Sequence, residues 1–230
     1  MDLIENQLNN PLKHWYYDHK FNSILRHLKS DLPVSKNLVD VGAGSALFSL
    51  ELLHQNDGLM CTAIDPGYHL DSFTDEKLRI TYLREPNGLQ GDLYLFTDVL
   101  EHVENDLAFL TTYVESAKIG AKFVVTVPAF MILWSGHDVF LKHFKRYRKM
   151  ELCQVLRKSG LTIQSVNYLY VLLFPVALLM RSLPKSRVSN SQLKNQGRFL
   201  NFIIKMILKT DFVLSKHVPF GVSIIAVATK

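Results

Sequence analysis

The stretch NLVDVGAGSALFSLELL, from Asn37 to Leu53, decides the fold of this chain. Its opening residues are mostly apolar and predict a short buried strand, whereas the apolar residues from Leu47 onward recur at helical spacing. Between them, Gly42 and Gly44 permit a tight turn and a close approach of the backbone to a ligand. The pattern predicts a strand, a turn and a helix whose N-terminus faces a bound molecule. A glycine pair alone is also typical of a plain strand-to-helix connection.

Two aspartates add chemistry to this turn. Asp65 ends a second apolar strand, MCTAIDP, where a carboxylate can accept hydrogen bonds from both hydroxyls of a ribose. Asp40 lies inside the first strand, where burial of its charge is costly unless a cation such as an ammonium group meets it. A ligand with both a ribose and an ammonium group fits S-adenosylmethionine better than a nicotinamide dinucleotide.

The chain resembles the class I S-adenosylmethionine-dependent methyltransferases in four segments, which are DVGAGSA at 40–46, AIDP at 63–66, FTDVLEHVEND at 96–106 and AKFVVTVPA at 121–129. The resemblance implies an α/β fold: a Rossmann-like, doubly wound, seven-stranded sheet with an antiparallel C-terminal strand and a helical insertion before it. It also implies S-adenosyl-L-methionine as the cofactor. One departure is Ala46, which stands at the third glycine position of the family's turn.

The resemblance assigns the cofactor contacts. After the first two strands it implies Asp40, Gly42, Ala43, Gly44, Asp65 and Pro66, and after the fourth strand Asp98 and Val99. The N-terminal segment HWYYDHK is similar to a helix that covers the cofactor in some relatives, which implies roles for Trp15 and Lys20. Aromatic core packing is the alternative there. For the adenine, the nearest candidates are Leu83, Arg84 and Glu85.

We expect the acceptor site in the loop after the fifth strand, at the ligand end of the sheet. Its catalytic candidates are His137, Asp138 and His143, and its acceptor-binding candidates are Trp134, Arg146 and Tyr147. His137 with Asp138 is expected to form a general base, and His143 with Arg146 to hold an anionic acceptor. Helix capping or a surface position is the alternative for either histidine. His102 is a further catalytic candidate, because the resemblance places it near the cofactor and the acceptor.

The length of 230 residues fits one domain. Its expected parts are an N-terminal helical cover (1–36), a cofactor-binding core (37–170), an apolar and basic helical insertion (171–221) and a last strand (222–230). Cys61 and Cys153 lie in apolar segments and show no metal-ligand spacing, so we expect a reducing cytoplasm and no metal site. The opening residues MDLIENQ carry no basic leader, so no secretory signal is expected.

The charge is divided between the two halves of the chain. Residues 1–117 hold 8 Lys and Arg against 18 Asp and Glu, whereas residues 118–230 hold 18 against 3. Two solvated halves of one domain that attract each other would explain this division. An anionic partner of the basic half, such as a phospholipid surface, a phosphate-bearing substrate or nucleic acid, is the alternative explanation.

The insertion combines apolar runs with a basic stripe. Residues 168–180 are all apolar or aromatic, but 13 residues that include Pro175 fall short of the roughly 20 needed to span a bilayer. A later helix is expected to carry one polar stripe, formed by Arg198, Asn201, Lys205 and Lys209. Packing within the domain, a homodimer contact and peripheral membrane contact are the alternatives for its wide apolar face.

These features predict a cytoplasmic enzyme, or one peripheral at a membrane, that methylates a small-molecule or lipid-linked acceptor. The first rival is an RNA or DNA methyltransferase. Against it, FTDVLEH stands where amino-methylating nucleic-acid enzymes have an Asn-Pro-Pro-Tyr-like tetrapeptide, so nucleic acid is not the expected partner. The second rival is a non-catalytic interaction module, and the presence together of Asp40, Gly42, Gly44 and Asp65 argues against it.

Overall fold

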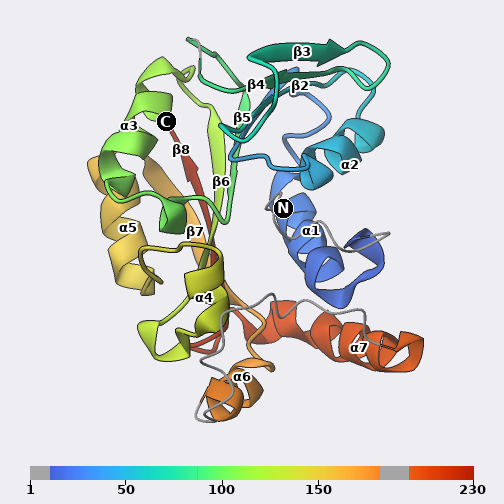
Figure 1. The fold of residues 1–230 in the computed structure, drawn as a ribbon, viewed down its shortest axis with the longest axis vertical. Coiled ribbons are helices and arrows are strands. Elements are labelled where there is room, and N and C mark those ends of the chain that lie inside the picture. Colours follow the sequence, from blue (N-terminus) through green and yellow to red (C-terminus); the bar gives the residue numbers. More distant parts are fainter. Residues whose placement is uncertain (1–10, 87, 182–196) are drawn as a thin grey trace.

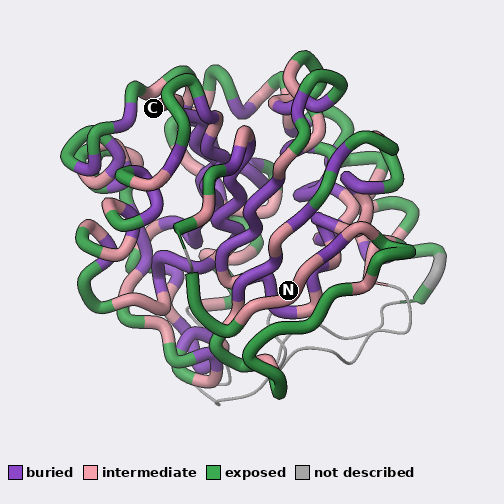
Figure 2. The backbone as a smooth tube through the Cα atoms, turned by 90° about the horizontal axis from the view of Figure 1, so that it is seen from above, coloured by how far each residue is buried: buried purple, intermediate pink, exposed green. Residues whose placement is uncertain are grey.

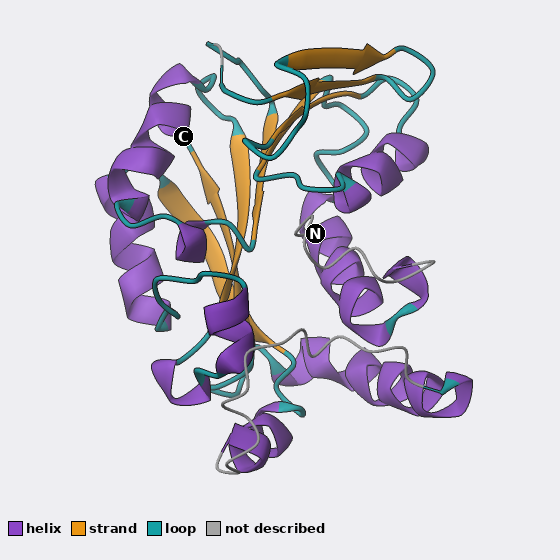
Figure 3. Cartoon of the chain, in the orientation of Figure 1, coloured by secondary structure: helices purple, strands orange, loops and turns teal. Residues whose placement is uncertain are grey.

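The computed structural model describes residues 11–86, 88–181 and 197–230, in which helices flank both faces of a central sheet (Figure 1, Figure 3). Helices α1 and α2 cover one face, and α3 and α5 cover the other. The described α-helices are α1 (Trp15–Leu28), α2 (Leu47–Gln55), α3 (Asp106–Ser116), α4 (Gly136–Phe140), α5 (Lys149–Lys158), α6 (Phe174–Arg181) and α7 (Arg198–Leu214). Short 3-10 helices are η2 (Pro11–Lys13), η3 (Leu100–His102) and η4 (Met131–Leu133).

The sheet of the described chain has eight strands in the order β3-β4-β2-β1-β5-β6-β8-β7. The strands are β1 (Asn37–Val41), β2 (Met60–Ile64), β3 (Ser72–Asp75), β4 (Ile80–Leu83), β5 (Leu93–Thr97), β6 (Lys122–Pro128), β7 (Thr162–Leu169) and β8 (Ser223–Thr229). The five strands from β4 to β6 in this order pair in parallel, and β8 runs antiparallel to both β6 and β7. This topology confirms the Rossmann-like sheet with an antiparallel C-terminal strand.

The eighth strand is the one that the sequence analysis did not expect. Strand β3 pairs antiparallel with β4 at the edge of the sheet, and its residues from Ser72 to Thr74 are exposed. It has no apolar alternation, because neither of its faces is buried in a core. A strand of this kind leaves no hydrophobic pattern in the sequence.

Two apolar cores lie on the two faces of the sheet. Figure 2 shows that the buried segments of the chain gather in the interior of the molecule. One core contains Phe48 and Leu52 of α2, and the other contains Leu110 of α3 and Leu156 of α5. The central strand β5 is buried along its whole length, as expected for a parallel strand that is covered on both faces. The apolar runs in the sequence therefore correspond to β1, β2, β5 and β6, the strands at the centre of the sheet.

Strand register brings the chemistry-bearing residues to one edge. Val41 of β1 pairs with Ile64 of β2 and with Phe96 of β5. The residues that follow these strands, which include the glycine turn, Asp65 and Asp98, therefore come together at the carboxyl ends of the strands. This edge of an open α/β sheet is where such folds bind ligands.

Helix α7 packs on α1 through its polar side. Asn201 accepts a hydrogen bond from the Trp15 backbone N–H at 2.8 Å and donates one to the Lys13 carbonyl at 2.8 Å. Lys205 forms an ion pair with Asp18 at 3.0 Å. The side chain of Arg198 lies outside the described residues, and Lys209 is exposed. Much of the expected polar stripe therefore faces the protein, which leaves apolar residues on the outer side of the helix.

A buried aspartate fixes α7 to the rest of the domain. Asp211 is fully buried and accepts hydrogen bonds from the backbone N–H groups of Tyr170 at 2.8 Å and Leu172 at 3.2 Å. Its Oδ2 also lies 3.1 Å from His19 Nε2 of α1. One side chain thereby joins α7, α1 and the segment after β7.

No helix of the described chain has the length and apolar character needed to cross a membrane.

Candidate functional site

The glycine turn follows β1 and is held in left-handed backbone conformations. Gly42 has φ +66° and Gly44 has φ +53°, and Ala46 at the N-cap of α2 has φ +53° as well. A Cβ added to Gly42 would lie 2.6 Å from a methyl carbon of Val99, the buried residue that follows Asp98. Glycine at position 42 is therefore required both by the backbone conformation and by the close approach of Val99.

Asp65 lies across this turn from the end of β2. Its Oδ2 accepts a hydrogen bond from the Gly44 N–H at 2.9 Å, and its Oδ1 accepts one from the Gly67 N–H at 2.8 Å. Tyr68, three residues further on, donates its hydroxyl hydrogen to the Gly44 carbonyl at 2.8 Å. Asp65 is half-buried, and Pro66 beside it is exposed. Each carboxylate oxygen has a second lone pair, so Asp65 retains acceptor capacity for a ligand.

Asp40 is buried next to the turn with little to compensate its charge. Ser49 of α2 donates a hydrogen bond to its Oδ2 at 2.6 Å, whereas its Oδ1 is buried and accepts no hydrogen bond within the described chain. Burial raises the pKa of Asp40 to about 6, and the negative charge of Asp65 acts in the same direction. A donor or cation that reached this oxygen would stabilise the ionised form.

Asp98 directly follows β5 in a left-handed conformation, with φ +57°, and contacts two residues of α1. Its Oδ2 contacts the Lys20 ammonium and accepts a hydrogen bond from the Tyr16 hydroxyl at 3.3 Å, while Thr126 donates to its Oδ1 at 3.0 Å. Burial alone would raise the pKa of Asp98, but Lys20 holds it below its usual range. The carboxylate that Lys20 meets is thus one of the protein itself.

Aromatic packing holds the start of α1 in place. The ring of Tyr16 stacks on Tyr170 with centroids 5.2 Å apart and planes at 10°, and Trp15 meets Tyr170 edge to face at 6.0 Å. The Tyr170 hydroxyl donates to the Tyr16 carbonyl at 2.6 Å. These contacts place Trp15, which is half-buried, and the fully buried Lys20 on the helix that approaches Asp98.

We call Asp40, the glycine turn, Asp65 and Asp98 the cofactor edge.

The loop from Ala129 to Tyr147, here called the acceptor loop, is organised by Asp138. Its carboxylate accepts hydrogen bonds from Arg146 Nε at 2.7 Å and Nη2 at 3.1 Å, and from the Ser135 N–H at 2.8 Å. His143 Nδ1 lies 3.0 Å from its Oδ1. Burial opposes ionisation, but His143 and Arg146 hold the pKa of Asp138 well below its usual range.

These contacts correct the expected pairings in the acceptor loop. Asp138 pairs with His143 and Arg146 and not with His137, with which it was expected to form a general base. His143 and Arg146, which were expected to hold an anionic acceptor, both contact the Asp138 carboxylate. The backbone N–H of His137 donates a hydrogen bond to Ser135 Oγ at 3.3 Å. Burial lowers the pKa of the His137 imidazole to about 4. His137 is therefore neutral at pH 7 and is a weak base.

Two of the expected acceptor-binding residues serve the interior instead. Tyr147 is fully buried, and its hydroxyl lies 2.7 Å from an Asp106 carboxylate oxygen and 3.1 Å from the Leu100 carbonyl. Arg146 is 6% exposed, and its guanidinium also donates to the Ala129 carbonyl at 3.2 Å. Both side chains are engaged within the protein, and their direct binding of the acceptor stays a prediction. Trp134 is half-buried at the end of η4 and stays a candidate.

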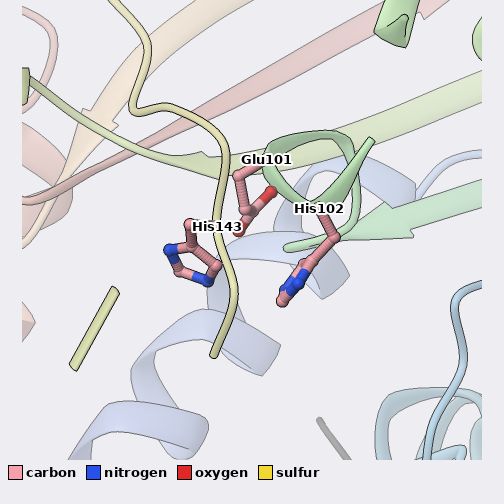
Figure 4. Close-up of side chains that lie close together, drawn as sticks. All are labelled: Glu101, His102 and His143. Atoms are coloured by element: carbon pink, nitrogen blue, oxygen red, sulfur yellow. The ribbon is translucent and has the colours of Figure 1, made fainter. Parts of the chain in front are cut away.

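Sequence reasoning did not assign a site role to Glu101. This residue is fully buried in η3, between Asp98 and the acceptor loop, and its side chain lies beside His102 and His143 (Figure 4). The rings of His102 and His143 meet edge to face, with centroids 4.6 Å apart. Glu101 belongs to the segment DVLEH, which the sequence analysis singled out. The sequence of a short turn does not show whether a glutamate within it is buried, so its role could not be predicted.

Solved structures with the same fold exist, although no family model and no curated protein matches this sequence. An S-adenosylmethionine-dependent methyltransferase from Archaeoglobus fulgidus is 14% identical, with a TM-score of 0.55 over 94% of this chain and 99% of that one. The pyocyanin biosynthetic protein PhzM is 15% identical, with a TM-score of 0.54 over 93% of this chain and 55% of its own.

A third similar structure is the [4+2]-cyclase SpnF, which is 14% identical, with a TM-score of 0.54 over 93% of this chain and 80% of its own. Likeness at these identities concerns the fold, and the reaction has to be argued from the site. With its sheet order, its antiparallel β8 and its glycine turn after β1, the chain has the fold of the class I S-adenosylmethionine-dependent methyltransferases.

Proposed function

We propose that this protein transfers the methyl group of S-adenosylmethionine to a small-molecule or lipid-linked acceptor. The observation that carries the proposal is the cofactor edge. There, a left-handed glycine turn, the carboxylate of Asp65 and the end of β5 at Asp98 come together at the carboxyl ends of adjacent parallel strands. The fold of SpnF shows that the scaffold alone does not decide between methyl transfer and another reaction.

The cofactor edge offers a partner to each polar part of this cofactor. Asp65 would accept the ribose hydroxyls with the lone pairs that the backbone of Gly44 and Gly67 leaves available. The buried Oδ1 of Asp40 would be stabilised by the ammonium of the methionine part, directly or through water. The backbone of Gly42, Ala43 and Gly44 would lie against the methionine part.

Methyl transfer from a sulfonium is an in-line displacement, and positioning is its main requirement. A well-oriented pair of reactants can gain about 7 to 11 kcal/mol from positioning alone. A general base is needed only when the acceptor atom carries a proton that must leave. Trp134 and His143 of the acceptor loop, together with His102 of η3, are the residues we propose to contact the acceptor.

Exposed apolar side chains on α6 and α7 support a lipid-linked acceptor and peripheral contact with an anionic membrane. They are Val176, Leu179, Met180, Phe199, Leu200, Phe202, Ile203, Met206, Ile207 and Val213. Both helices lie together at one end of the molecule (Figure 1). The half of the chain that contains them holds 18 Lys and Arg against 3 Asp and Glu, which complements anionic headgroups. A second copy of the chain is the competing occupant of this surface.

The test is methyl transfer from labelled S-adenosylmethionine into a cell extract that is separated into lipid and water-soluble fractions. We expect label in one product, most readily in the lipid fraction, and loss of that label with Asp65→Ala. Label in the water-soluble fraction would retain methyl transfer and remove the lipid-linked acceptor. Absence of labelled product with a protein that binds the cofactor would contradict the proposed activity.

A further inference from the structure

Three potential metal ligands converge between the cofactor edge and the acceptor loop. Within the described residues, Glu101, His102 and His143 each offer one ligand atom, and these atoms lie within 4.8 Å of one another. Glu101 and His102 are neighbours in η3, and His143 follows α4. A backbone hydrogen bond of 2.7 Å from the Phe144 N–H to the Glu101 carbonyl fixes the two segments together. In Figure 4 the Glu101 carboxylate points toward the two imidazole rings.

Glu101 holds a carboxyl group whose ionised form finds little compensation in the described chain. Its side chain is fully buried, and neither carboxylate oxygen accepts a hydrogen bond from another residue of the described chain. An ionised carboxylate in such a place costs several kcal/mol unless a cation meets it. Lys20 and Arg146, the two cations that act on it electrostatically, are hydrogen-bonded to Asp98 and Asp138.

His143 is oriented as a ligand by the carboxylate behind it. Asp138 is an acceptor for Arg146 and Ser135, so its contact with His143 requires that Nδ1 of the imidazole carries the hydrogen. The other ring nitrogen, Nε2, is then the one left to accept a proton or a metal ion. A histidine held by a carboxylate through one nitrogen and bound to a metal through the other is a recurrent arrangement in metalloproteins.

We propose that Glu101, His102 and His143 bind one divalent transition-metal ion. Two imidazoles and one carboxylate favour ions such as Zn²⁺ over Mg²⁺ and Ca²⁺, which prefer oxygen ligands. The ion neutralises the buried carboxylate and uses the nitrogen that Asp138 orients. Three protein ligands leave at least one coordination position for a further ligand, as in catalytic zinc sites.

The consequence for chemistry rests on the proposed function. An acceptor hydroxyl bound at the open position would lose its proton to solvent more readily, because the ion stabilises the resulting oxyanion. The oxygen would then attack the methyl carbon, and the electron pair of the broken carbon–sulfur bond would leave with sulfur to give S-adenosylhomocysteine. The site would therefore favour an acceptor that is methylated on oxygen.

The site is tested by metal binding to the full chain, without any methyl acceptor. After treatment with a chelator, the protein is dialysed against Zn²⁺ and the bound metal is measured by elemental analysis, with Mg²⁺ as comparison. We expect one Zn²⁺ per chain and, with Co²⁺ as a probe, visible absorption bands. Glu101→Gln and His143→Gln should each weaken Zn²⁺ binding by about 100-fold or more, since changes to residues that only support the ligands cost about 10- to 100-fold. The control His54→Gln changes a histidine of α2 with a side chain 64% exposed and should leave binding unchanged.

Folding and cofactor binding are separated in the same experiment. Glu101→Gln replaces a buried carboxyl group by a neutral amide of the same shape, so the metal-free variant should melt at or above the wild-type temperature while it fails to bind Zn²⁺. A folded wild type that binds no Zn²⁺, or a Glu101→Gln variant that binds it normally, would overturn the metal site. Calorimetry with S-adenosylmethionine on the same samples shows whether the proposed function fails independently.

Discussion

Asp138 of the acceptor loop and Asp40 of the cofactor edge are both buried, but the protein compensates their charges to different extents. In the acceptor loop, Asp138 is surrounded by donors from Arg146, His143 and Ser135, so its charge is satisfied by the protein. At the cofactor edge, Asp40 has one donor, Ser49, and a buried oxygen without a hydrogen bond in the described chain. Asp138 therefore stabilises the fold of the acceptor loop, whereas Asp40 retains polar capacity for a ligand. Mutations should therefore separate stability from binding.

The largest effect is expected for Asp138→Ala. The variant leaves the Arg146 guanidinium buried without its carboxylate, which should lower the free energy of unfolding by about 3 to 5 kcal/mol. The matched change at the cofactor edge, Asp65→Ala, removes two hydrogen bonds at a half-buried position where water can replace the carboxylate, and should cost about 1 to 2 kcal/mol. Urea unfolding of both variants measures the contrast. Equal losses would remove the distinction between the two regions.

Asp40→Asn should act in the opposite direction and depend on pH. The pKa of Asp40 is raised from 3.8 to about 6, so the folded protein holds a proton that the unfolded chain releases. Below about pH 4 the carboxyl group is protonated in both the folded and the unfolded state, so its burial costs no folding free energy. The cost of ionising it in the folded state grows as the pH rises from about 4 to about 6 and is complete above about pH 6. At about 1.4 kcal/mol per pKa unit, this amounts to about 3 kcal/mol.

The variant should consequently be more stable than the wild type at pH 7 by up to about 3 kcal/mol, and the advantage should disappear toward pH 4. Its amide oxygen can still accept the Ser49 hydrogen bond. Urea unfolding at pH 4, 5, 6 and 7 measures this difference. An advantage that stays constant with pH would show that Asp40 does not carry the penalty.

A smaller effect tests the packing of the glycine turn. Gly42→Ala places a methyl group 2.6 Å from a Val99 carbon at φ +66°, and Gly120→Ala adds one at φ +84° where no atom lies within 4 Å. Backbone strain should cost each variant about 1 to 2 kcal/mol, and the clash should cost Gly42→Ala about 1 kcal/mol more. Thermal melting of both variants isolates the clash. Identical melting temperatures would mean that Val99 moves without cost.

The smallest effect concerns the outer surface of α7. Lys205 is engaged with Asp18, so Lys209→Gln is the variant that removes a basic charge without removing an ion pair with α1. We expect co-sedimentation of the wild type with anionic vesicles, and about 1 kcal/mol weaker binding for the variant, or about fivefold. Lys158→Gln on α5 is the control. If the wild type forms dimers and ignores vesicles, the apolar surface of α6 and α7 belongs to a second copy.

The fold could be predicted because its signals are local. Apolar runs mark the strands of the sheet centre, and Gly42, Gly44 and Asp65 follow two of them directly, so the carboxyl ends of adjacent strands had to bring these residues together. Strand β3 was missed because it is short, exposed and without apolar alternation. The same reasoning explains why the placement of the cofactor edge was the most predictable part of the candidate site.

The acceptor loop was less predictable because its contacts depend on the course of the chain. Adjacent residues on a helix point in different directions, so His137 and Asp138 in α4 do not form the expected pair. His143 reaches Asp138 only because the chain turns after the helix. Burial of Tyr147 and the inward side of α7 are likewise set by tertiary packing. The proposed metal ligands have no common spacing, since Glu101 and His143 come from different elements.

Isothermal titration calorimetry with S-adenosylmethionine, on the wild type and on Asp65→Ala, measures whether the cofactor edge binds this cofactor through Asp65. We expect one cofactor molecule per wild-type chain. We also expect a loss of about 2 to 4 kcal/mol in binding free energy for Asp65→Ala, because two hydrogen bonds to a charged acceptor disappear. The melting temperature of the variant should stay near that of the wild type. Equal affinities would remove Asp65 from the site, and no binding by the wild type at any attainable concentration would contradict the assignment of the cofactor edge.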